Sequence, residues 1–180
     1  MKNLIKPVIV LTAIAFFCTA LLAGVNSLTK EKIKAAAQEK NNAAMRMLFP
    51  EEQAFENVEA DAELLKKYGV SKISKAAESK GFVYEVSTSG YGGEILIMIG
   101  FLEDGEILGV RILSHGETKG IGTRVVESEE FLSQFKGKNA LNEAGVDAVS
   151  GATVSSSAVL TGINNACNLF AEITEGGSGK

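Results

Sequence analysis

The residues best suited to chemistry are five hydroxyl side chains that crowd into eight positions late in the chain. They lie in the stretch DAVSGATVSSSAV, which begins at Asp147, and are Ser150, Thr153, Ser155, Ser156 and Ser157. An apolar helical pattern starts directly after them, and the N-terminus of a helix favours an anion. An N-cap at Thr153 or Ser155 accounts for one or two hydroxyls. The surplus indicates either a phosphate-binding corner or hydroxyls that simply face water, and spacing alone leaves both interpretations open.

Two further glycine-containing loops carry hydroxyls, namely Ser87-Thr-Ser-Gly-Tyr-Gly-Gly93 and Ser114-His-Gly-Glu-Thr-Lys-Gly-Ile-Gly122. Neither has the GxxxxGK[ST] pattern of a phosphate loop, and Gly120-Ile-Gly122 lacks the third glycine of a dinucleotide turn. The only histidine, His115, excludes a His-rich metal site, and no CxxC pair supports a zinc or iron–sulfur site. A hydrolase with Ser150 or Thr153 as nucleophile and His115 as base would need an acidic orienting partner.

The elements that position these loops predict an α+β fold. Two apolar runs, 94–101 and 106–113, surround the Asp104-Gly105 turn signal and predict an antiparallel hairpin whose near-continuous hydrophobicity indicates burial on both faces. The other predicted elements are helices at 26–50, 60–68 and 127–135, a strand at 81–87, and a helix with Val159, Ile163, Ala166, Cys167 and Phe170 on one side. We therefore expect a mainly antiparallel sheet flanked by helices.

The N-terminus predicts a membrane anchor. Residues 7–25 contain no charge. This run is long enough for a transmembrane helix and longer than the apolar core of a cleaved secretory signal. Lys2 and Lys6 favour a cytoplasmic N-terminus, although lysines also follow the span. The net charge of −4 argues against nucleic acid as a partner. We expect a membrane anchor at 1–25, a helical stalk at 26–50, a domain at 51–175 and a disordered tail at 176–180.

The late motif has a close family likeness. Asp147-Ala-Val-Ser-Gly-Ala-Thr153 resembles the Asp-x-x-Ser/Thr-Gly-Ala-Thr signature of covalently flavinylated FMN-binding domains. STSGYGGEI, the Asp-Gly hairpin and HGETKGIG are similar to the other blocks of the G-subunit family of Rnf electron-transport complexes, which are membrane ferredoxin:NAD oxidoreductases that pump sodium ions or protons. The family block reads His-x-Glu-Thr-Pro-Gly-Leu-Gly, and Lys119 replaces its proline here. The resemblance covers essentially the whole chain.

This resemblance implies a cofactor and its site. A separate flavin transferase would use FAD to form a phosphoester between FMN and the Thr153 hydroxyl, after reading the motif made of Asp147, Ser150, Gly151, Ala152 and Thr153. Hydroxyls would donate to the phosphate, and the flavin ring would lie against the two upstream loops. The residues implied in these contacts are Ser150, Ser155 and Ser156 at the phosphate, and Gly90, Tyr91, Gly92, Glu117 and Thr118 at the ring or ribityl chain.

The resemblance also implies the role and the partners. The chain would be an electron-carrier subunit, not a stand-alone catalyst, in a bacterial or archaeal cytoplasmic membrane, with its FMN domain on the outer face. Its partners would be the lipid bilayer, the flavin transferase, and the other membrane and iron–sulfur or flavin subunits of the complex. Two alternatives stay open: the C subunit of the sodium-pumping NADH:quinone oxidoreductase, which shares this domain, and a tethered binding or scaffold module without covalent flavin.

Overall fold

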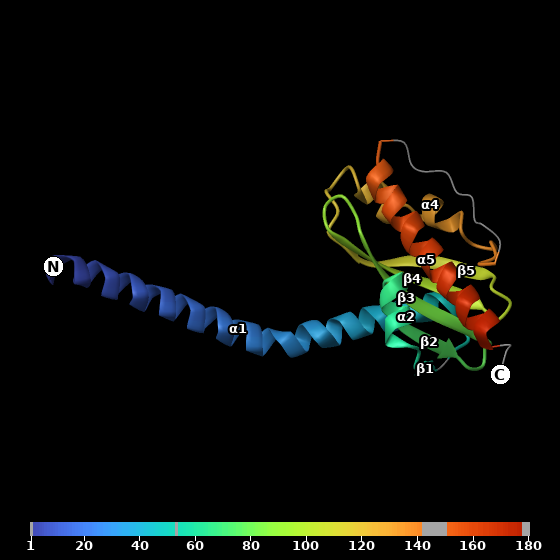
Figure 1. The fold of residues 1–180 in the computed structure, drawn as a ribbon, viewed down its shortest axis with the longest axis horizontal. Coiled ribbons are helices and arrows are strands. Elements are labelled where there is room, and N and C mark those ends of the chain that lie inside the picture. The colour runs from blue at the N-terminus through green and yellow to red at the C-terminus, as the bar shows by residue number, and fades with distance from the viewer. Residues whose placement is uncertain (1, 53, 142–150, 178–180) are drawn as a thin grey trace. The chain divides into compact units, whose positions relative to one another are not determined.

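The computed structural model describes residues 2–52, 54–141 and 151–177, and the chain divides into two units, Met1–Asn41 and Asn42–Lys180. The first helix, α1, spans Lys2–Leu48 and ends just before Pro50, as the sequence predicts (Figure 1). From Lys6 on, it contains an apolar stretch with a mean hydropathy of 2.6 that is long enough to cross a membrane. Large apolar side chains of this stretch, such as Phe16 and Phe17, are exposed, as lipid contact requires.

The second unit is built on a five-stranded antiparallel sheet in which the strands pair in chain order. Its strands are β1 Phe55–Asn57, β2 Val70–Ala76, β3 Gly81–Ser89, β4 Glu94–Leu102 and β5 Ile107–His115. The predicted hairpin is confirmed as β4 and β5, and Gly105 in its turn has a φ of +85° that favours glycine. The predicted α+β fold is confirmed, but β1 and β2 were not predicted.

Among the described residues, four helices complete the second unit: α2 Ala62–Tyr68, α3 Thr123–Val126, α4 Glu129–Ser133 and α5 Thr153–Gly177. Figure 1 shows α5 running across the strands, where it packs against β3 and β4. The five apolar residues that the helical spacing placed on one side of α5 are all buried there. At Gly162 the helix lies so near the sheet that a Cβ would come 2.7 Å from Thr88 Cγ2. Of the predicted tail, 176–177 belong to α5 and 178–180 lie outside the described residues.

The other face of the sheet is covered by the end of α1 and by Phe49. Since successive side chains of a strand alternate between faces, Val83 and Met98 point away from α5, and they cluster with Leu48 and Phe49. Glycines make room for this contact: a Cβ at Gly81 would lie 2.5 Å from the Phe49 ring. The central strands are therefore buried on both faces, as their near-continuous apolar runs predict.

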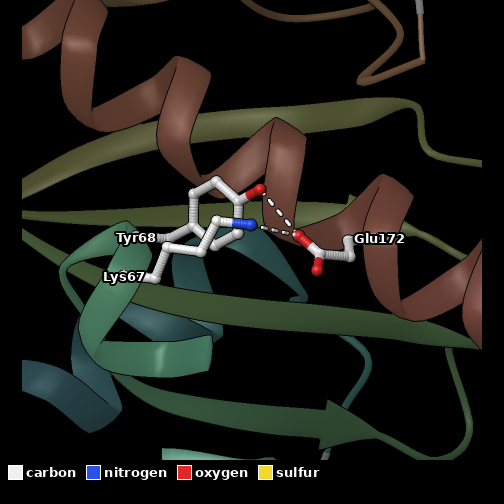
Figure 2. A network of polar contacts seen from close by, with 3 residues as sticks. All are labelled: Lys67, Tyr68 and Glu172. Atoms are coloured by element: carbon white, nitrogen blue, oxygen red, sulfur yellow. Dashed lines mark hydrogen bonds and ion pairs between the residues drawn. The ribbon is translucent and has the colours of Figure 1, made fainter. Parts of the chain in front are cut away.

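Polar contacts join α2 to α5 at the surface. The αL conformation of Gly69, with a φ of +65°, ends α2 at the position that the sequence indicates. Glu172 Oε2 accepts hydrogen bonds from the Tyr68 hydroxyl at 2.7 Å and from Lys67 Nζ at 3.0 Å (Figure 2). These two bonds hold the pKa of the Glu172 carboxyl below its ordinary value. Because all three groups are accessible to water, their contribution to stability is small.

Candidate functional site

Three segments that are distant in the sequence meet at the carboxylate of Glu117. The side chain is buried, with 8% of its surface exposed. Its Oε1 accepts a hydrogen bond of 2.8 Å from the backbone N–H of Tyr91, in the loop between β3 and β4. Its Oε2 accepts one of 2.9 Å from the Ser155 hydroxyl, in the first turn of α5. The two upstream glycine loops and the hydroxyl-rich segment are thus parts of one site.

Glycines enclose this carboxylate. A Cβ at Gly90 would lie 1.9 Å from Glu117 Oε1, and a Cβ at Gly122 would lie 1.9 Å from Glu117 Oε2. A Cβ at Gly92 would lie 2.4 Å from the carbonyl oxygen of Gly116. These distances leave no room for a side chain, so the glycines allow the two loops to approach each other. The role that the resemblance implies for Gly90 and Gly92, close approach to a cofactor, stays a prediction.

The first turn of α5 separates the hydroxyls by exposure. Ser155 and Ser156 are buried, whereas Thr153 and Ser157 are exposed. Gly151, just before the helix, has a φ of +81°, and Ala152 is buried. A group attached to the Thr153 hydroxyl would extend into solvent without disturbing the core. Two residues of the predicted site, Asp147 and Ser150, lie outside the described residues.

The buried hydroxyls direct their hydrogens into the protein. Ser155 donates to Glu117 Oε2, and Ser156 donates to the carbonyl oxygen of Ala152 at 3.0 Å. Because a hydroxyl has one hydrogen to donate, neither has it free for a phosphate at Thr153 in this arrangement. The first backbone N–H groups of a helix lack intrahelical acceptors, and at α5 they are donors suited to an anion.

Each of the same three segments also carries an exposed apolar side chain. These are Tyr91, Ile121 and Val154, with 66%, 48% and 56% of their surface exposed. Thr118 is exposed beside the buried Glu117, so the two residues expected to act together at the flavin differ in accessibility. Tyr91 and Thr118 were candidates from the resemblance, whereas the structure adds Ile121 and Val154. Their signal in the sequence was an apolar residue next to each glycine or hydroxyl motif.

His115 contacts another element. Its Nε2 lies 3.6 Å from Glu127 Oε1, and its Nδ1 is buried without a hydrogen-bond partner among the residues that the structure describes. A hydrolase that uses Thr153 needs the imidazole beside the threonine hydroxyl. The polar neighbour of His115 among the described residues is Glu127 instead, so the geometry does not support that alternative at Thr153.

Two parts of the chain match known protein families. Residues 1–47 match the RnfG N-terminal region, and residues 90–168 match the FMN-binding domain family. The G subunit of the ion-translocating oxidoreductase complex of Shewanella baltica is 34% identical over 150 residues, covering 77% of this chain and 71% of that protein. The corresponding protein of Haemophilus influenzae is 30% identical over 171 residues, covering 84% and 83%.

A relative of lower identity and one solved structure are also similar to this chain. The G subunit of the proton-translocating ferredoxin:NAD(+) oxidoreductase complex of Clostridium ljungdahlii is 27% identical over 175 residues, covering 92% of this chain and 91% of that protein. The crystal structure of Shewanella oneidensis NqrC is similar, with a TM-score of 0.50 and 24% identity over 58% of this chain and 61% of that chain. At that identity the likeness shows a shared fold.

Proposed function

This chain belongs to the G-subunit family of ion-translocating oxidoreductase complexes and carries an FMN-binding domain, and we propose that it relays electrons through an FMN esterified to Thr153. Its family and its FMN-binding domain make it an electron-carrier subunit, and the apolar stretch of α1 anchors it in the membrane. The observation that carries the proposal is the position of Thr153: an exposed hydroxyl at the first residue of a long helix.

The described residues fit a phosphate at Thr153. The N-terminus of α5 presents backbone N–H groups to an anion, and a negative charge there is favoured by about 0.3–1 kcal/mol. In the attachment, the Thr153 hydroxyl oxygen gains a bond to phosphorus and releases its proton, while the pyrophosphate bond of FAD breaks and AMP leaves. The flavin transferase would supply this reaction after binding the segment from Asp147 to Thr153. Ser150, which lies outside the described residues, stays a predicted hydrogen-bond donor to the phosphate.

The three segments that meet at Glu117 also carry side chains suited to a flat aromatic ring. Tyr91, Ile121 and Val154 expose apolar surface, and Thr118 adds an exposed hydroxyl. When bound, FMN would supply the redox chemistry, and the protein would orient it and exclude water from one face. The ester would prevent loss of the cofactor from a domain outside the cytoplasm, where no FMN pool replaces it.

The family supports a proposal for the partners, and the lysines before the span support one for the orientation. We propose that the chain exchanges electrons with the other membrane and iron–sulfur or flavin subunits of its complex. Lys2 and Lys6 before the span favour a cytoplasmic N-terminus, which puts the FMN domain on the outer face. The test is a reporter enzyme, fused after Lys180, that works only outside the cytoplasm; we expect it to be active. If a reporter that works only in the cytoplasm is active at the same position, this orientation is contradicted.

The attachment is tested by expressing the chain with an active flavin transferase and viewing the denatured protein in a gel for flavin fluorescence. Wild-type protein is expected to fluoresce, and Thr153→Val, which keeps the shape but lacks the hydroxyl, is expected to stay dark. Ser157→Ala is the matched control, because it removes another exposed hydroxyl, one turn along the same helix. A dark wild type, or a fluorescent Thr153→Val variant, contradicts the proposal.

The alternative of an NADH:quinone oxidoreductase C subunit has less support. The structural likeness to NqrC reaches 24% identity and concerns the fold. The G-subunit relatives reach 34% identity, and the N-terminal 47 residues match the region specific to that family.

A further inference from the structure

We propose that Glu117 is a positioning residue that fixes the attachment site by bridging the β3–β4 loop to the first turn of α5. The proposal rests on the function proposed above, because it concerns how Thr153 is presented for modification. It differs from the expectation that Glu117 binds the flavin directly. The carboxylate is buried behind the site and is held by two protein donors, the Tyr91 N–H and the Ser155 hydroxyl.

The bridge joins three segments that are distant along the chain, at the end of the sheet where β4 pairs with β5 and α5 packs against β3. Tyr91 precedes Glu117 by 26 residues, and Ser155 follows it by 38. Each carboxylate oxygen accepts from a different segment, so the side chain sets the distance between the β3–β4 loop and α5. Hydrogen bonds to a charged acceptor are the stronger ones, and a buried acceptor is costly to leave without its donors.

The glycines make the bridge rigid. Gly90 lies against Oε1 and Gly122 against Oε2, each so near that a Cβ there would be 1.9 Å away. The carboxylate is therefore enclosed on both sides, and its rotamer is set by backbone atoms. A site whose supporting residue has one allowed position keeps its geometry before any ligand binds.

The consequence for Thr153 follows from its place in the helix. Ser155 is two residues after Thr153 in the same first turn. The ends of a helix are its least stable part, because their backbone groups lack intrahelical partners. Holding Ser155 to Glu117 keeps this turn folded and keeps the Thr153 hydroxyl at a set position relative to Tyr91. Without the bridge, the turn can open while the rest of α5 stays packed on the sheet.

Two substitutions at Glu117 separate the bridge from the charge. Glu117→Ala removes both hydrogen bonds. Glu117→Gln keeps both links, because its oxygen can accept from the Tyr91 N–H while its nitrogen donates to the Ser155 oxygen, which accepts as well as donates. The assay is the rate of FMN attachment to the full chain in nanodiscs, with purified flavin transferase and FAD, over a range of chain concentrations.

We expect Glu117→Ala, which removes both hydrogen bonds, to lower the maximal rate at least about tenfold, which corresponds to about 1.4 kcal/mol. The half-saturating chain concentration should change little, since the recognition motif is intact. Glu117→Gln should stay within about threefold of wild type, and so should Ser157→Ala. Hydrogen exchange at the first turn of α5 should become faster in Glu117→Ala and stay normal in Glu117→Gln.

The proposal is overturned if Glu117→Ala is modified at the wild-type rate, or if Glu117→Gln is as defective as Glu117→Ala. If Glu117→Ala fails to fold, Ser155→Ala decides, because it removes one arm of the bridge and leaves the other. A slowed Ser155→Ala with normal hydrogen exchange in the sheet supports the bridge, and an unchanged rate overturns it. A wild type that stays unmodified by active transferase contradicts the proposed function instead, so the two failures are distinguishable.

Discussion

Gly122→Ala is expected to destabilise the protein strongly, although alanine suits the backbone there. Gly122 has φ −67° and ψ −31°, so the substitution brings no backbone strain. The new Cβ would lie 1.9 Å from Glu117 Oε2, about 1.5 Å short of the 3.4 Å at which ordinary contact begins. A displacement of that size breaks the bond of 2.9 Å from Ser155. The lost charged hydrogen bond costs about 1.5–3 kcal/mol and the overpacking about 1–3 kcal/mol, so we expect a loss of about 2.5–6 kcal/mol.

The assay is a urea titration of the full chain in nanodiscs, followed by near-ultraviolet circular dichroism. Gly137→Ala is the control, because Gly137 has a φ of +78° and no atom within 4 Å of its Cβ position. Its cost should be that of a left-handed backbone alone, about 1–2 kcal/mol. A Gly122→Ala variant at least as stable as Gly137→Ala would refute the idea that Glu117 is rigidly enclosed.

Three further predictions concern the packing around the sheet. Phe49→Ala should lower the free energy of unfolding by about 3–5 kcal/mol, because the buried ring packs against Gly81. Met47→Ala, at an exposed position of α1, should change it by less than about 0.5 kcal/mol. Equal urea midpoints for the two variants would contradict this prediction. Burial raises the pKa of the Cys167 thiol to about 11, so in a Cys18→Ser variant a maleimide near pH 8 should label it only after unfolding, and rapid labelling of the folded protein would contradict its burial. Burial also raises the pKa of the Glu85 carboxyl above its ordinary 4.5, so above pH 4.5 the folded state binds more protons than the unfolded state. The free energy of unfolding therefore falls as the pH rises from 4.5 through the folded-state pKa. Glu85→Gln should raise the urea midpoint near pH 7 more than near pH 4, and an equal effect at both pH values would contradict the burial of a charged Glu85.

The elements that the sequence predicted are those with local signals. The β4–β5 hairpin follows from two apolar runs around Asp104-Gly105, and α5 follows from apolar residues at helical spacing. The strand β2, Val70–Ala76, was missed because its apolar residues Val70, Ile73 and Ala76 recur every third position, not every second as in a regular strand. Its pairing with β3 has a register shift between Val70 and Lys72. The strand β1 has three residues, too few to show a pattern in the sequence, and its pairing with β2, from Phe55 with Ala76 to Asn57 with Ser74, identifies it.

The candidate site was predicted in composition but not in its contacts. Glycines and hydroxyls identified the three segments, and Thr153 was named from the resemblance. The sequence led us to expect Glu117, Ser155 and Ser156 to face the cofactor, whereas the structure has Ser155 donating to Glu117 and Ser156 donating to Ala152. Such pairings depend on how the loops approach in three dimensions, and no spacing along the chain encodes an approach across 38 residues.

The central claim is that Thr153 carries FMN as a phosphoester. The most direct measurement is fragment-ion sequencing, by mass spectrometry, of the 139–180 peptide released by cleavage after Lys138 in protein expressed with an active flavin transferase. The account predicts that the mass of FMN minus water is added at Thr153 and at no neighbouring hydroxyl. An unmodified peptide, or the same added mass on Ser150, Ser155 or Ser157, would contradict it.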